Sequence, residues 1–96
     1  MAPEPTVTDN ADLSRYEIAL GEQRVGLLTY RVTGDVITML HAEIDPAHGG
    51  QGLGTALARG ALDDARSRGL SVRPLCPFVA DLVRREPDTY ATLLAD

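Results

Sequence analysis

The chain has 96 residues, enough for one small domain, and its 44% hydrophobic and 24% charged residues are typical of a soluble globular protein. Its net charge is −5. Because non-specific nucleic-acid binding depends on basic side chains, we expect no nucleic-acid partner. One cysteine and two histidines remote from it fit no zinc spacing, so we expect no metal. The absence of a long apolar run and of a signal-peptide pattern predicts a cytoplasmic protein that does not bind membranes.

The first residues have few large side chains. Residues 1–11 carry two prolines and no apolar period. This predicts a disordered tail, followed by a single domain over residues 12–96. Tyr16, Ile18 and Leu20 alternate with polar or small residues, and the alternation predicts the first strand.

Two more strands follow with short connections. Residues 24–32 and 36–44 have strand patterns, and Thr33-Gly34-Asp35 between them is of hairpin length. Because parallel strands need longer crossovers, the first three strands are predicted to form an antiparallel meander.

The pattern then becomes helical. Apolar residues recur along one face of residues 52–68, and Gly69 is a natural end for this helix. Residues 70–75 follow as a fourth strand. The connection through the helix is long enough for a right-handed crossover, so this strand is predicted to be parallel to the third.

The C-terminal part is predicted to be helical as well. A second helix is expected to begin near Pro77, because proline suits the first helical position. Pro87 interrupts it, and a last helix is predicted over residues 88–94 with Asp88 as its cap. The elements together predict a compact α/β (α+β) fold.

The strand over residues 36–44 ends in ionisable side chains. Since side chains alternate along a strand, one face is expected to carry four of its residues: Ile37, Met39, His41 and Glu43. The two ionisable groups would lie roughly 7 Å apart by the rise of a strand. His41 and Glu43 are therefore candidate catalytic residues, with a solvated strand end as the alternative.

A glycine-rich run separates this strand from the helix. Four glycines fall within six residues: Gly49, Gly50, Gly52 and Gly54. Glycine leaves backbone amides open to a ligand, and a helix start adds unpaired N–H groups and partial positive charge. The run therefore predicts a phosphate or pyrophosphate site. Gly54-Thr55 lacks the lysine of a P-loop, and the glycine spacing does not fit the dinucleotide-binding pattern.

The single cysteine lies between the fourth strand and the second helix. If the helix begins at Pro77, Cys76 is its N-cap, where the positive end of the helix dipole favours a thiolate. A lone cysteine is otherwise a small buried hydrophobic residue. The sequence leaves both interpretations open.

Three runs together resemble a known family. His41-Ala42-Glu43-Ile44-Asp45-Pro46, followed by Gly50-Gln51-Gly52-Leu53-Gly54, is similar to the acetyl-CoA-binding motif of the GCN5-related N-acetyltransferases. The later run Pro74-Leu75-Cys76-Pro77-Phe78 makes the chain similar to a compact, single-domain branch of that superfamily.

The resemblance implies how acetyl-CoA would bind. The backbone amides of the glycine run would hold the pyrophosphate of coenzyme A. The main chain around Ile44 and Asp45 would hydrogen-bond the pantetheine arm, where the third and fourth strands splay apart. The residues implied to bind the cofactor are Ile44, Asp45, Gly49, Gly50, Gln51, Gly52, Leu53, Gly54 and Thr55.

The resemblance also implies catalytic positions. Glu43 matches the family's general base, which commonly acts through a water, and His41 and Cys76 match site positions of the compact branch. Gly49 departs from the family, which usually has arginine there, and we expect cofactor binding to be weaker by about 1–2 kcal/mol. Cys76 and Phe78 stand where a general-acid tyrosine is often found.

The function implied is acetyl-CoA-dependent transfer of an acetyl group to an amine, such as a protein or peptide lysine, an N-terminus or a polyamine. The acidic balance favours a basic protein or small amine as acceptor. Direct transfer, with Glu43 or His41 accepting the amine proton, is the expected route, and an acyl-enzyme on Cys76 is the alternative.

A non-catalytic acyl-CoA-binding or protein-interaction module and a generic phosphate-binding domain are competing functions. The oligomeric state stays open.

Overall fold

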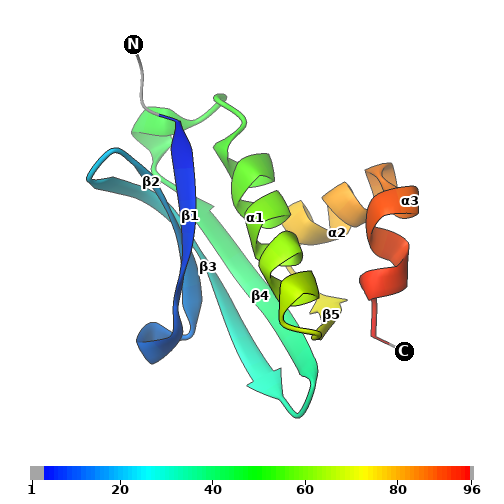
Figure 1. Cartoon of the computed structure of the whole chain (residues 1–96). Helices are drawn as coiled ribbons and strands as arrows, with labels where there is room; N and C mark the ends of the chain where they lie inside the picture. Colours follow the sequence, from blue (N-terminus) through cyan, green and yellow to red (C-terminus); the bar gives the residue numbers. More distant parts are fainter. Residues whose placement is uncertain (1–3, 96) are drawn as a thin grey trace.

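The computed structural model describes residues 4–95, which form a five-stranded sheet and three α-helices (Figure 1). The strands are β1 (Pro5–Asn10), β2 (Arg15–Leu20), β3 (Gln23–Thr33), β4 (Val36–Ile44) and β5 (Ser71–Pro74). The helices are α1 (Leu53–Ser67), α2 (Pro77–Arg85) and α3 (Pro87–Tyr90), with short 3₁₀ helices η1 (Ala11–Leu13), η2 (Pro46–His48) and η3 (Ala91–Leu93). Strand order follows the chain, antiparallel up to β4 and parallel between β4 and β5.

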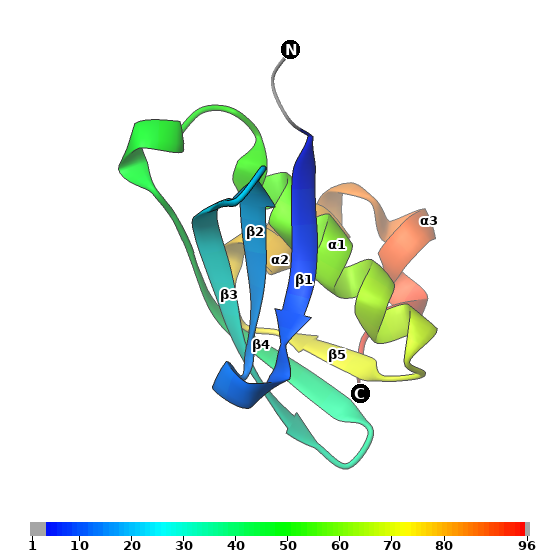
Figure 2. The ribbon, with the colours of Figure 1, turned by 60° about the vertical axis from the view of Figure 1, so that its left-hand side comes forward.

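The helices cover one face of the sheet. α1 contacts all five strands, and α2 contacts α1, β4 and β5. Figure 2 shows the helices on one side of the strands. The apolar stripe predicted on α1 is buried against the sheet: Leu53, Leu57, Ala58, Ala61, Leu62 and Ala65. The predicted meander, crossover helix and parallel strand are confirmed, and the core lies between α1 and the sheet.

The other side of the sheet, here named the helix-free face, is lined by the residues that alternate with buried ones. Tyr16 and Ile18 of β2 are buried, so Arg15 and Glu17 point away from the helices. Residues directly opposite each other on neighbouring strands share a face. The observed pairing therefore continues this face across β3 and β4 through Leu27, Thr29, His41 and Glu43.

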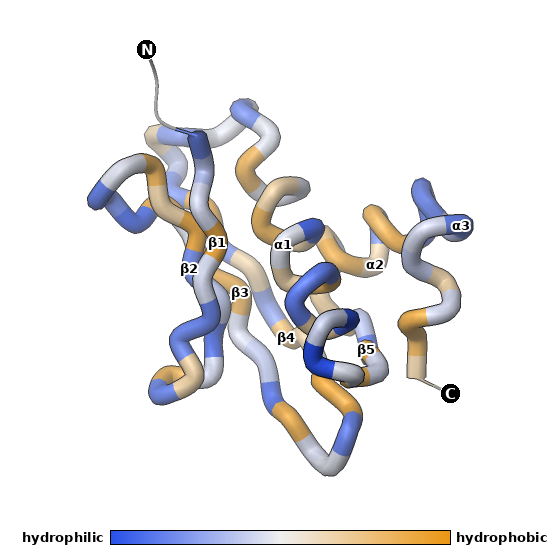
Figure 3. Tube along the Cα trace, in the orientation of Figure 1, coloured by the Kyte–Doolittle hydropathy of each residue, from blue (hydrophilic) through white to orange (hydrophobic). Residues whose placement is uncertain are grey.

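Hydrophobic residues are spread over many short stretches. The tube of Figure 3 changes colour every few residues along α1 and the strands. None of the helices described between residues 4 and 95 combines the length and apolarity that crossing a bilayer requires.

β1 corrects the prediction of a disordered tail. That prediction is wrong for Pro5–Asn10, which pair with β2 in antiparallel register. Residues 1–3 of the predicted tail lie outside the described part of the chain. Val7 packs on α1 at Gly60, where a Cβ would lie 2.8 Å from the valine side chain. A strand with so few apolar contacts shows no hydrophobic period, which is why the sequence pattern did not predict it.

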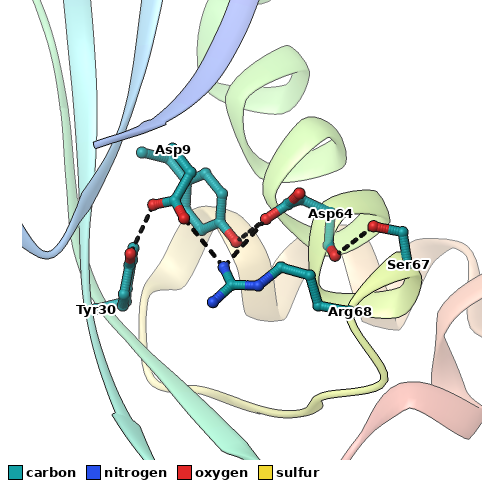
Figure 4. A network of polar contacts seen from close by, with 6 residues as sticks. Asp9, Tyr30, Asp64, Ser67 and Arg68 are labelled. Atoms are coloured by element: carbon teal, nitrogen blue, oxygen red, sulfur yellow. Dashed lines mark hydrogen bonds and ion pairs between the residues drawn. The ribbon is translucent and has the colours of Figure 1, made fainter. Parts of the chain in front are cut away.

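A polar network attaches β1 to the rest of the fold (Figure 4). The hydroxyl of Tyr30 donates to Asp9 at 2.5 Å, and the hydroxyl of Tyr16 donates to Asp64 at 2.7 Å. Arg68 donates to both carboxylates, at 3.0 Å and 3.3 Å. The network joins β1, β2 and β3 to the C-terminal end of α1, and these polar contacts compensate for the small apolar surface of β1.

The two tyrosines predict a loss of stability in alkali. Burial, and secondly the hydrogen bond to Asp64, raises the pKa of the Tyr16 hydroxyl well above its usual value. Burial and the hydrogen bond to Asp9 raise the pKa of Tyr30 to about 12. A raised pKa means that the folded state holds the phenol proton more tightly, so this stabilisation is complete below the unfolded pKa and is lost as pH rises through the folded pKa. We expect the free energy of unfolding, measured in urea, to fall between about pH 10 and about pH 12. In the Tyr30→Phe variant this free energy should fall less steeply over the same pH range. An equally steep fall in Tyr30→Phe would contradict this assignment.

The C-terminal helices differ from the prediction. A four-residue helix, α3, followed by η3 replaces the single helix predicted over residues 88–94, and the N-cap is Glu86 rather than Asp88. Proline has no N–H to lose in the first turn, so the helix begins at the proline instead of after it. Arg59 of α1 donates to both carboxylate oxygens of Glu86, at 2.9 Å and 2.8 Å, which attaches α3 to α1.

Candidate active site

β4 has a free edge over its second half. The parallel pairing of β4 with β5 ends at Met39 and Pro74. The Met39 carbonyl accepts hydrogen bonds from the N–H groups of Leu75 at 3.0 Å and Cys76 at 2.9 Å, and the chain then enters α2. Among the described residues, the rest of β4 pairs with β3 alone. Residues 40–44 therefore present unpaired backbone groups to which an extended ligand can hydrogen-bond.

A β-bulge at Leu40 changes which side chains share a face. Consecutive residues of β3 pair with Met39 and His41, so Leu40 between them has no partner. The prediction that His41 and Glu43 share a face with Met39 is therefore wrong, because the extra residue reverses the alternation. Ile44 packs against the core instead. His41 and Glu43 lie on the helix-free face.

The structure brings His41 and Glu43 together. The Nε2 atom of His41 lies 3.4 Å from Oε1 of Glu43, and the side chains are 63% and 67% exposed. Both side chains project from the part of β4 that has the free edge. A proton can therefore pass between either group and water beside any ligand bound along that edge.

The glycine run follows this edge directly in the chain. Gly50 and Gly52 have φ angles of +79° and +75°, a conformation that side chains rarely adopt. Gly52 is the N-cap of α1 and supplies no side-chain hydrogen bond. The first N–H groups of α1 are therefore left for a ligand, and anions bind at such helix starts.

Asp45 shapes the loop before the glycines. Its carboxylate accepts a hydrogen bond from the Ala47 N–H at 3.0 Å. Its own N–H donates to the Val25 carbonyl at 2.7 Å, and its carbonyl accepts from the N–H of His48 at 2.8 Å. The main chain of Asp45 is thus already hydrogen-bonded. Of the two residues predicted to contact pantetheine, Ile44 belongs to the free edge and Asp45 follows it.

Gly49 and Gly54 differ from the other two glycines. Gly49 has φ −65° and ψ 152°, which any residue adopts, and a Cβ there would lie 3.5 Å from its nearest neighbour, the Pro46 carbonyl oxygen. Gly54 is buried in the first turn of α1, and a Cβ there would lie 2.6 Å from the ring of Phe78. Gly54 therefore lets the first turns of α1 and α2 pack closely.

Cys76 is separated from the two ionisable residues. α2 begins at Pro77 with Cys76 as its N-cap, as predicted, but the thiol makes no capping hydrogen bond. The residue is 0% exposed and belongs to the hydrophobic core. His41 and Glu43 lie on the helix-free face, so the structure does not bring Cys76 together with them. Its burial favours the interpretation as a small hydrophobic residue.

A pocket of about 520 Å³ lies between the beginning of β3 and the end of β4. It is lined by Arg24, Val25, Gly26, Leu27, Glu43, Ile44, Asp45 and Pro46. Five of these residues were not predicted from the sequence as site residues: Arg24, Val25, Gly26, Leu27 and Pro46. A glycine inside a strand was the available signal, because it marks a close approach. A Cβ on Gly26 would lie 2.6 Å from Ile44 and 2.8 Å from the carbonyl oxygen of Glu43.

The site combines three features: a strand with a free edge, a glycine-rich helix start that follows it, and two ionisable side chains beside it. Such an α/β domain is suited to an extended, phosphate-bearing ligand. Residues 15–93 match the family model described as GCN5-related N-acetyl-transferase, and the chain belongs to this family. The motifs in the sequence predicted this family. Among curated proteins, none matches the chain significantly.

Two solved structures share the fold. A GCN5-like protein from Staphylococcus aureus is 24% identical with a TM-score of 0.68, over 94% of this chain and 87% of that one. The ribosomal-protein-S18-alanine N-acetyltransferase from Escherichia coli is 23% identical with a TM-score of 0.58, over 62% of this chain and 39% of that one. The match thus spans well under half of the Escherichia coli enzyme. The predicted compact form of the fold is confirmed.

Proposed function

We propose that the protein transfers the acetyl group of acetyl-CoA to an amine. The observation that carries this proposal is the free edge of β4 over residues 40–44, which leads directly into the glycine-rich start of α1. The pantetheine arm is extended and contains two amide groups, so it can bind this edge as an added strand would. The pyrophosphate then reaches the N–H groups of residues 49–55.

Transfer is proposed to be direct. The neutral amine nitrogen attacks the thioester carbonyl carbon, so that an N–C bond forms and the C–S bond breaks. The proton lost by the nitrogen passes to Glu43 through a water, and the coenzyme A thiolate takes up a proton from solvent. Glu43 suits this role because its side chain is exposed beside the free edge, with His41 at 3.4 Å as a second proton acceptor.

The buried position of Cys76 supports direct transfer over an acyl-enzyme. We expect Cys76→Ala to keep kcat within about threefold of wild type, because in direct transfer its thiol forms no covalent bond. The variant should lose about 1 kcal/mol of stability from the small cavity it creates. Steady-state release of coenzyme A, measured well below the Tm of the variant, checks this. A loss of more than about 100-fold in a folded variant would instead favour the acyl-enzyme route.

Gly49 offers a gain-of-affinity test. Its φ and ψ suit any residue, so arginine fits without strain. We expect Gly49→Arg to lower the Kd for acetyl-CoA by about tenfold, through a charge-assisted hydrogen bond to a phosphate. Gly49→Ala is the matched control and should leave the Kd unchanged. An arginine variant that binds no more tightly than the alanine variant would show that the phosphates lie elsewhere.

The proposal is tested by calorimetric titration of acetyl-CoA, with desulfo-coenzyme A and AMP as comparators. We expect micromolar binding of acetyl-CoA, far weaker binding of AMP, and release of coenzyme A thiol when an amine is added. No binding at millimolar acetyl-CoA would overturn the proposal. Binding without transfer to any amine would favour the non-catalytic acyl-CoA-binding module, for which the missing arginine at Gly49 is the specific observation.

A further inference from the structure

We propose that the pocket between β3 and β4 binds the acceptor, and that the acceptor is a small amine which also carries a carboxylate. This inference rests on the proposed function. In the bound state, Arg24 would hold the carboxylate and Glu43 would face the amine.

The pocket includes Glu43, the proposed base, and shares Glu43 and Ile44 with the segment of β4 that has the free edge. Its lining comes from the first residues of β3 and the last of β4, on the β3 side of β4. The free edge of β4 is on the β5 side. The pocket thus lies where β4 pairs with β3, whereas the proposed cofactor site lies at the opposite edge of the same strand. Glu43 lines the pocket, and His41 lies 3.4 Å from it. A volume of about 520 Å³ suits a small molecule.

The charged side chains of the pocket differ in whether they already have partners within the protein. The Asp45 carboxylate caps η2 through Ala47, and its second oxygen lies 3.6 Å from His48. Among the ion pairs of the described residues, Glu43 pairs with His41 alone, and the charge of His41 depends on protonation. None of the ion pairs found within residues 4–95 includes Arg24. Arg24 acts on Glu17 through its charge alone, and the pKa of that carboxyl is lowered mainly by the hydrogen bond from Arg15. The guanidinium N–H groups of Arg24 and the carboxylate of Glu43 therefore remain available to a ligand.

The spacing and surroundings of these two charges fit a zwitterion. Leu27 is paired with Glu43, and Arg24 precedes Leu27 by three residues, roughly 10 Å along a strand. Arg24 pairs with Ala19 of β2. Ala19 and Glu17 both alternate with the buried Ile18, so they lie on the helix-free face, and Arg24 shares that face. A guanidinium binds a carboxylate through two parallel hydrogen bonds. Leu27 supplies an apolar wall for the carbon chain between the two groups.

The pocket thus favours a more specific class of acceptor than the net charge of the chain does. A chain with net charge −5 favours a cationic acceptor such as a lysine side chain or a polyamine. An arginine that forms no ion pair, in the same pocket as the proposed base, opposes a second positive charge on the ligand and favours a negative one. The local charges decide, because they act at contact distance whereas the net charge is screened by salt.

The test is an acceptor series with acetyl-CoA and the full-length protein. Unbranched amino acids from glycine through 4-aminobutyrate to 6-aminohexanoate are each paired with the alkylamine that lacks the carboxylate. Putrescine and a lysine peptide represent the cationic acceptors. The readout is kcat/KM from release of coenzyme A thiol, with acetyl-CoA binding measured by calorimetry on the same samples.

We expect at least one amino acid to exceed its matched alkylamine by about tenfold or more in kcat/KM. Arg24→Gln should remove that advantage, with a loss of about 10- to 100-fold for the amino acid and less than about threefold for the alkylamine. Arg31→Gln is the matched control, because Arg31 is also an exposed arginine of β3 but does not line the pocket. It should leave all rates unchanged.

The contrary results separate the two proposals. Higher rates for putrescine or the lysine peptide, or an Arg24→Gln variant that keeps the preference for amino acids, overturn the inference and leave the proposed function standing. Acetyl-CoA binding without turnover of any amine overturns both the inference and the enzymatic function. Absence of acetyl-CoA binding overturns the proposed function at its first step.

Discussion

Replacing Glu43 by glutamine is expected to lower kcat by about 10²- to 10⁴-fold, the range that a general base contributes. Glutamine keeps the size of the side chain but cannot take up the amine proton. The Kd for acetyl-CoA should stay within about threefold of wild type, because cofactor contacts are proposed for the backbone of β4 and the glycine run. Coenzyme A release and calorimetry on the same variant separate the two effects.

Glu22→Gln provides the control for the loss of one carboxylate. Glu22 is exposed in the turn between β2 and β3 and does not line the pocket. Its substitution should change neither kcat nor the Kd. If Glu43→Gln kept wild-type kcat, proton removal would have to be assigned to His41 or to solvent, and His41→Ala in the Glu43→Gln background would tell these apart.

The largest effect on stability is expected for Gly26→Ala. An added methyl group would lie 2.6 Å from the Ile44 side chain, 3.0 Å from Ile18 and 2.8 Å from the Glu43 carbonyl oxygen. The carbonyl belongs to the β3–β4 pairing and cannot move without disturbing it. We expect a loss of about 2–3 kcal/mol, seen as a decrease of roughly 10 °C or more in Tm.

Gly49→Ala is the matched substitution for this prediction. Gly49 has ordinary extended backbone angles, and its nearest neighbour leaves a methyl group at van der Waals distance. Alanine there should be neutral or stabilising by about 0.4–1 kcal/mol, because it restricts the unfolded chain. Equal melting temperatures for the two variants would contradict the close packing of Gly26.

The sequence predicted the elements that have a strong hydrophobic period. The apolar stripe of α1 and the alternation in β2 are features of single elements, and both were confirmed. β1 was missed because its attachment depends on partners far along the chain. Asp9 is held by Tyr30 and Arg68, 21 and 59 residues away. No local pattern reports such a contact.

The bulge at Leu40 limited the prediction of the site. His41 and Glu43 were chosen correctly as a neighbouring pair, but strict alternation placed them on the buried face. A bulge depends on how β3 pairs with β4, which a single strand pattern does not reveal. The close packing of Gly54 on Phe78 was likewise not predictable, because Phe78 lies on another helix.

Perturbation of backbone amide NMR signals by acetyl-CoA tests the central claim most directly, namely that coenzyme A lies along the free edge of β4 and at the start of α1. We predict that the largest shifts occur in residues 40–44 and 50–55, with much smaller shifts in β1 and β2. Desulfo-coenzyme A should perturb the same amides. Shifts confined to β1, β2 or α3, or no shifts at millimolar acetyl-CoA, would contradict the account.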